Sequence, residues 1–368
     1  MASTQDALYR RIDLDLSWSE SDLPERVRTK HVHRLHPYLG KFIPQLVEAL
    51  LARHVPRGRV LDPFAGSGTT LVQALESGLD AAGSDVAPFN CLLMRVKTRE
   101  YNPFVLESEL RDALARLEGF DGTKPEGAIS RYLRDWYAPR AAAELLFFRG
   151  LVEDYEHSDV LRVVLARAAR SARRTAHFDL DFPRVPRRGE YWCHKHRKTC
   201  QPVGEARRFL RRYALDTLAR VREFSRVRAG GRAAEVLHGD ARELDFGARF
   251  DGVVTSPPYP GLIDYHEQHR YAYELLGLGE CRELELGKGT NRAALSSYSA
   301  GIAAVLANVR PALRPGAPVV IVINDRRELY PEILDRAGLR LEERYRRHVN
   351  RRTGRRSGEF YEDILVAR

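Results

Sequence analysis

The residues with the clearest chemical potential are Ser256, Pro257, Pro258 and Tyr259, a tetrad that follows an apolar run at residues 250–254. A serine hydroxyl and the next carbonyl oxygen can accept hydrogen bonds from the two protons of a flat amine, which draws the amine lone pair out of a conjugated ring. The two prolines restrict the backbone, so that the Pro257 carbonyl is kept out of a sheet ladder. Tyr259 offers a ring face on which an unstacked base can lie. The tetrad therefore predicts activation of an exocyclic amine.

A glycine-rich turn at residues 62–70 is the second chemical feature, and it leads from a short strand into a helix. Gly66 and Gly68 let the backbone approach a ligand closely, and the helix N-terminus favours polar and anionic groups. The next strand ends in Asp85, about 20 residues after the glycines, where nucleotide-binding units place the carboxylate that binds ribose hydroxyls. The turn is neither the dinucleotide pattern G-x-G-x-x-G nor a triphosphate G-K-[ST]. We therefore expect a different nucleoside cofactor.

Together the tetrad and the turn resemble the S-adenosylmethionine-dependent amino DNA methyltransferases, over residues 31–97 and 233–368. A tetrad that begins with Ser is similar to their N4-cytosine branch, whereas adenine enzymes more often begin with Asp or Asn. The resemblance implies S-adenosyl-L-methionine as cofactor, duplex DNA as partner, base flipping, and direct methyl transfer to N4 of cytosine by the residues Ser256 to Tyr259. No Pro-Cys nucleophile stands at this strand, which argues against the C5-cytosine mechanism.

Two further segments carry candidate cofactor contacts. Residues 36–44, before a helix expected over 44–53, resemble the family element that closes over the methionine end of the cofactor, although a hydrophobic staple would give the same pattern. The strand over 235–238 leads into Gly-Asp-Ala, which is also an ordinary turn signal. The resemblance implies that Asp240 in this turn accepts from the adenine amine of the cofactor. Asp62 resembles the acidic residue at the cofactor's amino-acid end. The expected cofactor-binding residues are Tyr38, Lys41, Phe42, Asp62, Phe64, Gly66, Gly68, Thr69, Thr70, Asp85, Asp240 and Ala241.

The elements around these motifs alternate between strands and helices. The run at 319–323 is continuously apolar, as a central parallel strand should be. Further elements are expected as helices over 264–276, 296–313 and 331–337 and as strands over 340–345 and 360–366. This order predicts an α/β fold of the class I, Rossmann-like type, with a mostly parallel seven-stranded sheet and an antiparallel last strand. The turn and the tetrad would both lie at the carboxyl ends of their strands.

Residues 98–232 form a largely helical insertion, with helical spacing over 140–155, 160–174 and 203–226. It is the candidate target-recognition region. Within it, Cys193, His196 and Cys200 have ligand types suited to zinc, but a structural zinc site wants four ligands. We therefore expect no metal here and interpret the segment as a basic surface loop in which Arg197 or Lys198 contacts phosphate.

An arginine-rich segment at 346–356 separates the last two expected strands. If the strand before it is parallel to the catalytic strand, the loop emerges on the active-site face, where arginine suits phosphate recognition. A solvated hairpin tip would have the same composition. The candidate phosphate contacts are Arg346, Arg347, Arg351, Arg352, Arg355 and Arg356.

Composition is consistent with a polyanionic partner. The 368 residues carry 60 basic and 50 acidic side chains, a formal charge of +10, although an arginine-rich composition also arises in GC-rich genomes. Residues 1–30 are expected to form a surface arm. No signal peptide or membrane span is expected, and four scattered cysteines suggest a reducing, cytoplasmic setting.

The alternatives to N4-cytosine methylation are N6-adenine or RNA amino methylation and a non-catalytic nucleic-acid-binding protein. A cognate restriction endonuclease would be a separate partner.

Overall fold

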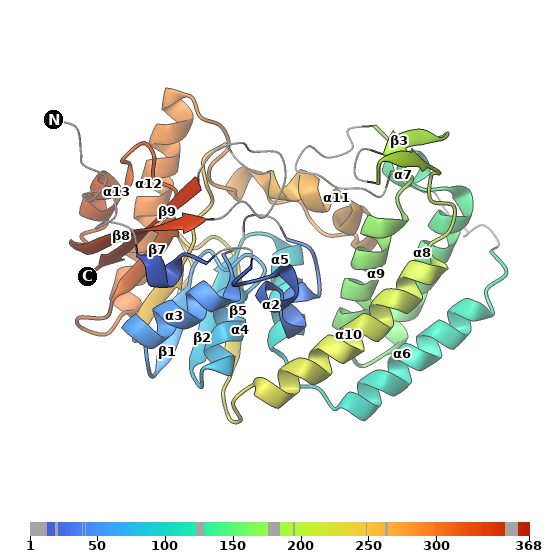
Figure 1. Ribbon diagram of the computed structural model, residues 1–368, viewed down its shortest axis with the longest axis horizontal. Helices are drawn as coiled ribbons and strands as arrows, with labels where there is room; N and C mark the ends of the chain where they lie inside the picture. Colours follow the sequence, from blue (N-terminus) through green and yellow to red (C-terminus); the bar gives the residue numbers. More distant parts are fainter. Residues whose placement is uncertain are drawn as a thin grey trace.

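The computed structural model describes residues 13–18, 21–38, 40, 42–122, 129–175, 185–193, 196–247, 249–261, 264–349 and 360–368. Within these ranges, seven strands form a central sheet in the order β5-β2-β1-β6-β7-β9-β8 (Figure 1). The strands are β1 (Arg59–Asp62), β2 (Asp80–Asp85), β5 (Ala234–His238), β6 (Gly252–Thr255), β7 (Val319–Ile323), β8 (Leu341–Val349) and β9 (Phe360–Ala367). Of these seven strands, β9 alone runs opposite to the others, so its pairings with β7 and β8 are antiparallel and the remaining pairings are parallel. The expected mostly parallel, Rossmann-like sheet is therefore confirmed.

Helices cover both faces of the sheet, which explains why all five residues of β7 are apolar and buried. Ile321 faces a core shared with α12 (Arg292–Val309) and α13 (Tyr330–Arg336). Val320 and Val322 face the opposite core, shared with α3 (Pro44–His54) and α4 (Thr69–Glu76). Since side chains alternate along a strand, one strand contributes to both layers.

Local signals explain where several helices begin. Proline stands in the first turn of α3, α5 (Pro88–Thr98), α6 (Pro103–Glu118) and α8 (Pro139–Leu151), where its missing N–H has no intrahelical partner to lose. Asp264 caps α11 (Tyr265–Leu276), and Asn291 caps α12, which therefore starts before the expected residue 296. No helix in the described part of the chain is long and apolar enough to cross a membrane.

The insertion packs as an extension of the sheet's helical layer, to the right of the sheet in Figure 1. Its other helices are α7 (Arg131–Trp136), α9 (Ser158–Ala172) and α10 (Arg207–Val227). One continuous apolar cluster joins residues of these helices, such as Leu165 and Leu218, to Phe89 of α5 and Tyr271 of α11. Sequence reasoning missed α5, α6 and α7, together with a hairpin of β3 (Tyr191–Cys193) and β4 (Lys198–Cys200).

Part of the expected N-terminal arm contacts the edge of the sheet. The 3-10 turn Leu14–Leu16 places Leu16 in the core beside α3, with 1% of its surface exposed. The Asp13 N–H donates to the Arg346 carbonyl, and the Ser17 hydroxyl accepts from the His348 N–H. This segment is therefore attached to β8. A short helix, α2 (Glu25–Arg28), follows it.

Candidate active site

A pocket opens at the carboxyl ends of β1, β2, β5 and β6. The loops that follow these four strands supply most of its wall, because parallel strands bring their carboxyl ends to one edge of the sheet. Segments from elsewhere in the chain close the remaining sides. The lining includes Tyr38, Gly40, Phe42, Phe64, Gly66, Thr69, Asp85, Asn90, Asp240, Ala241, Ser256, Pro258, Tyr265, Glu285 and Val305.

The glycine turn needs its glycines for different reasons. Gly66 has a φ of 52° and lines the pocket, and a Cβ on it would lie 3.0 Å from the Tyr38 hydroxyl. Gly68 has a φ of 82° and lies behind the wall, where a Cβ would lie 2.9 Å from Cγ of Met94. Gly66 therefore lets backbone reach the pocket, whereas Gly68 lets α4 pack closely on α5.

Asp85 ends β2 and lines the pocket. Its Oδ2 accepts from the Gly66 N–H at 3.1 Å, and its Oδ1 accepts from the Ala87 N–H at 2.8 Å. Burial raises the pKa of this carboxyl, while these hydrogen bonds and that of Asn90 oppose the shift. The carboxylate is thus held in place at the pocket wall, where it can accept from ligand hydroxyls.

Asp62 ends β1 but is fully buried and does not line the pocket. Its Oδ2 accepts from the Thr70 hydroxyl at 2.6 Å, and its Oδ1 accepts from the Thr255 hydroxyl at 2.6 Å. Burial raises its pKa to about 6. Thr70 is buried as well, and its hydroxyl also lies 3.1 Å from the Val254 carbonyl. Asp62 and Thr70 therefore join β1, α4 and β6 behind the pocket.

An aromatic group forms the wall beside the glycine turn. The Tyr38 ring stacks on Tyr265 and His269, and the Tyr38 hydroxyl accepts from Nδ2 of Asn90 at 3.2 Å. Burial lowers the pKa of His269 to about 3, so this imidazole is neutral at physiological pH. Phe42 lines the pocket, whereas Lys41 lies outside the described residues.

Asp240 and Ala241 line the same pocket from the loop after β5. The Asp240 carboxylate accepts from Nε of Arg242 at 2.9 Å and from the Arg242 N–H at 2.9 Å. The side-chain hydrogen bond from Arg242 lowers the pKa of Asp240. This carboxylate is therefore ionised and an acceptor for a ligand amine.

The tetrad contributes to two pockets. Ser256 and Pro258 line the main pocket, and Pro257 is buried outside its lining. Tyr259 lines a second pocket together with Tyr298, Tyr330 and Phe360. The Tyr259 hydroxyl donates to Oε1 of Glu362 at 3.1 Å, and loss of solvation raises the pKa of this phenol well above its usual range. Tyr259 is thus a neutral side chain held at the boundary of this second space.

Comparison with known proteins places this geometry in a family. The chain is 35% identical to the type II methyltransferase M.MjaII of Methanocaldococcus jannaschii over 449 aligned positions, which cover 98% of this chain and 84% of that protein. The chain belongs to the type II methyltransferases. This methyltransferase uses S-adenosylmethionine as its methyl donor.

Other similarities are more distant. The type II methyltransferases M.MvaI of Kocuria varians and M.BsoBI of Geobacillus stearothermophilus share 24% and 23% identity, over 62% and 70% of this chain and 53% and 55% of theirs. TrmN from Thermus thermophilus aligns over 89% of this chain and 49% of its own, with 15% identity and a TM-score of 0.34. The rRNA methyltransferase aviRa from Streptomyces viridochromogenes aligns over 95% and 93%, with 16% identity and a TM-score of 0.35. No protein-family model matches the chain.

The lining of the methyltransferase's main pocket fits this cofactor. Asp85 and Asp240 each present a carboxylate at the pocket wall, and a carboxylate can accept hydrogen bonds from the hydroxyls or the amine of a nucleoside. Phe64, Ala241 and Val305 supply apolar surface for a flat ring. The cofactor supplies a methyl group on a sulfonium, and the pocket residues would bind and orient it.

Asn90, Tyr265 and Glu285 are among the lining residues that the sequence analysis missed. Asn90 and Tyr265 hold the Tyr38 ring, and Glu285 lies in the loop after the 3-10 turn Arg282–Leu284. Burial raises the pKa of Glu285 to about 7, and repulsion from Asp264 adds to the shift. Glu285 stands in no recognisable motif, so only its place in the fold reveals it.

The candidate phosphate contacts of this methyltransferase differ in their exposure and in their ion pairs within the protein. Arg347 is 4% exposed, and its Nε donates to Glu362 at 2.8 Å, so we withdraw it as a phosphate contact. Arg346 is partly exposed and pairs with Asp363 at 2.9 Å. Arg197 and Lys198 are exposed on the β3–β4 hairpin. The remaining candidates, Arg351, Arg352, Arg355 and Arg356, lie outside the described residues.

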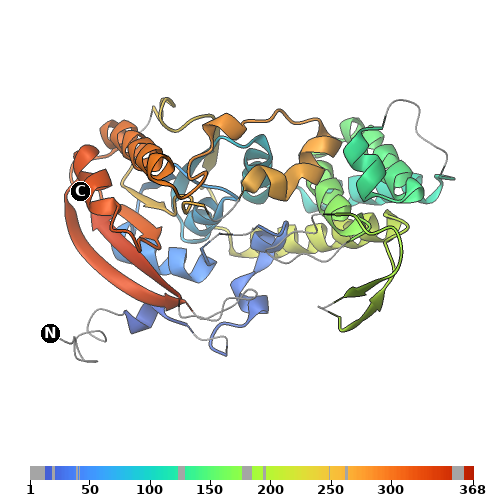
Figure 2. The ribbon, with the colours of Figure 1, turned by 90° about the horizontal axis from the view of Figure 1, so that it is seen from above.

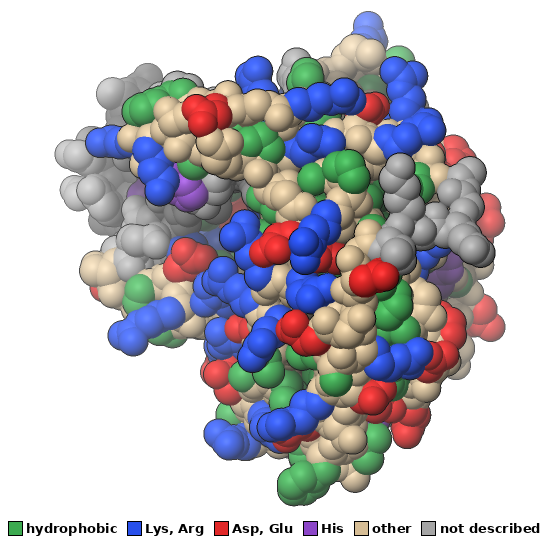
Figure 3. Space-filling view, turned by 90° about the vertical axis from the view of Figure 1, so that its right-hand side faces the viewer, with side chains coloured by type: hydrophobic (Ala, Val, Ile, Leu, Met, Phe, Trp, Pro, Cys, Tyr) green, Lys and Arg blue, Asp and Glu red, His purple; other side chains and the backbone are tan. Residues whose placement is uncertain are grey.

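Many arginines of the insertion have acidic partners within the protein. Arg222 of α10 pairs with Glu107 of α6, and Arg207 pairs with Glu118. On the face shown in Figure 3, basic side chains accordingly lie interspersed with acidic ones. Much of the arginine excess therefore joins helices, and only its unpaired part is available to a polyanion.

Proposed function

We propose that this methyltransferase transfers a methyl group from S-adenosylmethionine to the exocyclic N4 amine of cytosine at a specific site in duplex DNA. One observation carries the proposal. Ser256, the first residue of the tetrad, lines the same pocket as Asp85 and Gly66. An amine held by Ser256 would therefore lie beside the cofactor that Asp85 binds.

The chemistry assigned to the tetrad is activation by hydrogen bonding. The Ser256 hydroxyl and the Pro257 carbonyl accept the two amine protons, and the nitrogen lone pair is then directed toward the methyl group. Pro257 is buried and adjoins β6, which Thr255 links to Asp62. The acceptors are thus attached to the sheet before the substrate arrives, which limits their reorganisation during the reaction.

The target base would enter on the side of Tyr259. The Tyr259 ring borders the second pocket, whose other aromatic residues are Tyr298, Tyr330 and Phe360. Its hydroxyl is bound to Glu362, which fixes the ring edge and leaves a face for stacking. A base rotated out of the duplex would stack there and present its amine to Ser256.

A covalent C5 mechanism lacks its nucleophile. That route needs a thiolate against the ring of the base, yet no cysteine lines either pocket in the described chain. Cys91 is buried in α5, and Cys193 and Cys200 lie in the insertion hairpin. We therefore propose direct transfer.

Duplex DNA would cross the face that carries the tetrad. We assign residues 31–97 and 233–368 to catalysis and residues 98–232 to target recognition, with Arg197, Lys198, Arg346, Arg351, Arg352, Arg355 and Arg356 as phosphate contacts. Phosphate contacts orient a duplex but carry no sequence information, so base-edge contacts must come from other side chains. A cognate restriction endonuclease would be a separate protein.

Mass spectrometry of modified nucleosides tests the proposal. The purified protein is incubated with labelled S-adenosylmethionine and, separately, with duplex genomic DNA and total RNA, and Ser256→Ala is the matched control. N4-methylcytosine in DNA, absent with the variant, supports the proposal. N6-methyladenine or a methylated RNA product would show that the substrate is not cytosine N4 in DNA. C5-methylcytosine would contradict direct transfer to an amine. Cofactor binding without any product across genomic DNA would favour a non-catalytic nucleic-acid-binding protein.

A further inference from the structure

The β3–β4 hairpin has little apolar support of its own. It extends away from the helices of the insertion, at the lower right of Figure 2. Each strand has three residues, and the two strands form a sheet of their own. Among these six residues only Cys193 is buried, and Trp192 is 57% exposed. Because an isolated two-stranded hairpin is only marginally stable in water, its shape requires another stabilising interaction.

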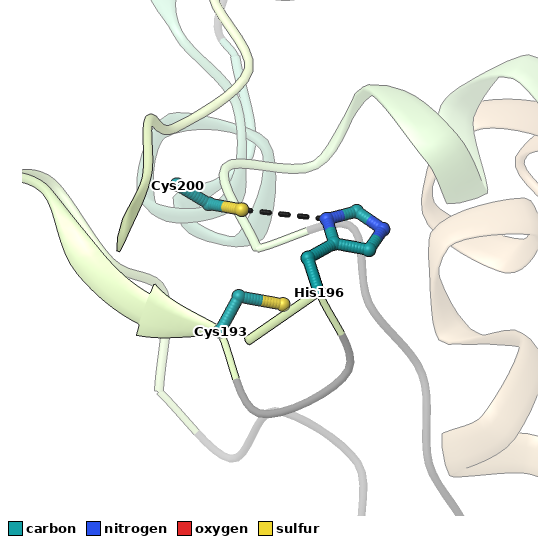
Figure 4. Close-up of side chains that lie close together, drawn as sticks. All are labelled: Cys193, His196 and Cys200. Atoms are coloured by element: carbon teal, nitrogen blue, oxygen red, sulfur yellow. Dashed lines mark hydrogen bonds between the residues drawn. The ribbon is translucent and has the colours of Figure 1, made fainter. Parts of the chain in front are cut away.

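The strand register brings two thiols to one face of the hairpin. Cys193 pairs with Lys198 and Tyr191 pairs with Cys200, so Cys193 and Cys200 are diagonal neighbours on the same face. Arg197, in the turn, has a left-handed φ of 50°, and His196 before it turns back over the two thiols (Figure 4). Nδ1 of His196 lies 3.4 Å from Sγ of Cys200. All three ligand atoms lie within 4.8 Å of one another.

We propose that Cys193, His196 and Cys200 bind a zinc ion, with water as the fourth ligand. Thiolate and imidazole are the ligands that zinc prefers, at about 2.3 Å from sulfur and 2.0 to 2.1 Å from nitrogen. In a tetrahedral site these bond lengths separate a sulfur and a nitrogen by about 3.6 Å. The observed 3.4 Å between His196 and Cys200 is close to that value. Small side-chain movements would complete the site.

The proposed site reverses the expectation from spacing alone. Three ligands within eight residues seemed too few for zinc, but the hairpin register converts them into one converging set. Zinc would join β3, the turn and β4, and metal binding would then contribute to folding of the hairpin. The ion lies beside Arg197 and Lys198, so it would also fix the exposed basic tip. The metal site itself is independent of the substrate proposed above.

Metal analysis of the full-length protein tests the site directly. After purification without chelator, the wild type should contain about one zinc per chain by inductively coupled plasma mass spectrometry. Cobalt replacement should give a thiolate-to-cobalt charge-transfer band. Cys193→Ser and Cys200→Ser should each lose most of the bound metal and this band. Cys281→Ser is the matched control and should keep both, because Cys281 lies outside the cluster.

Cofactor binding provides the folding control, since the main pocket contains none of these three residues. Each variant should bind S-adenosylmethionine with wild-type affinity in calorimetry. The proposal is overturned if zinc added to wild type binds no more tightly than to Cys193→Ser. It is equally overturned if a cobalt spectrum lacks thiolate character. A disulfide between Cys193 and Cys200, detected by thiol titration before reduction and persisting with zinc present, would replace the metal site with a redox link.

Discussion

The carboxyl ends of β1 and β2 lie side by side, and each strand ends in an aspartate with different surroundings. Asp62 is fully buried, and two threonine hydroxyls occupy its oxygens. Asp85 is partly exposed, and two backbone N–H groups hold its oxygens at the pocket wall. Both carboxyl pKa values are raised by burial.

This comparison shows that position in the fold does not by itself give an aspartate its role. The hydrogen-bond partners of Asp62 come from α4 and β6, so its carboxylate joins parts of the protein. The partners of Asp85 come from the turn it faces and from its own loop, so a ligand can still reach it. We therefore propose that Asp62 positions the catalytic loop and that Asp85 binds cofactor.

The largest expected effect is on kcat, and it concerns Ser256, which is not a hydrogen-bond partner of either aspartate. Ser256→Ala should lower kcat by about 10²- to 10³-fold, because one preorganised hydrogen-bonding group for the reacting amine is lost. The Kd for S-adenosylmethionine should change little, since Asp85 remains in place. Single-turnover kinetics and calorimetry measure the two quantities. Equal losses of kcat and cofactor affinity in Ser256→Ala would contradict the proposal that Ser256 activates the amine while Asp85 binds the cofactor.

Stability should depend on the protonation of Asp62. Its folded pKa of about 6 exceeds the usual 3.8, so the folded state binds the proton more tightly than the unfolded state. The free energy of unfolding should therefore fall by about 3 kcal/mol in total as pH rises from well below 3.8 to well above 6, with about 2 kcal/mol of this loss between the two pKa values. Asp62→Asn should lack this decline. Urea unfolding of both proteins between pH 4 and about 7 gives the difference, and parallel curves would contradict the burial argument.

Asp85 should affect cofactor binding. Asp85→Ala should weaken S-adenosylmethionine by about tenfold to a hundredfold, because hydrogen bonds to a charged group contribute about 1.5–3 kcal/mol. Calorimetric Kd values measure the loss, and Asp62→Asn is the neighbouring control, expected to retain affinity. A smaller loss of cofactor affinity in Asp85→Ala than in Asp62→Asn would contradict the roles proposed for the two aspartates.

The smallest expected effect is at Thr255, which joins the two strand ends β1 and β6. Thr255→Val removes the hydroxyl that donates to Asp62, and should cost about 1 kcal/mol of stability with a several-fold lower kcat. Thr217→Val in α10 is the matched control, since the Thr217 hydroxyl is buried and has no hydrogen-bond partner among the described residues. Thermal unfolding and steady-state kinetics compare them. A larger loss in the control would show that the Asp62 link contributes nothing specific.

The sequence predicted the sheet, the order of its elements and the approach of the tetrad to the glycine turn. It could do so because strand periodicity is local and parallel strands bring their carboxyl ends to one edge. It did not predict α5 or α6, whose apolar positions face other helices as well as the sheet. It also did not predict that Arg347 is buried against Glu362 within an arginine-rich stretch.

The sequence by itself therefore determined the fold class and the segments that meet in the main pocket. Only the tertiary structure decided which side chains in those segments face the pocket. Asp62 and Asp85 have equivalent positions at the ends of neighbouring strands, and Glu285 has no motif at all. Their surroundings come from residues distant in the chain, such as Thr255 beside Asp62. Burial and hydrogen-bond partners depend on long-range packing, which no local pattern of residue types records.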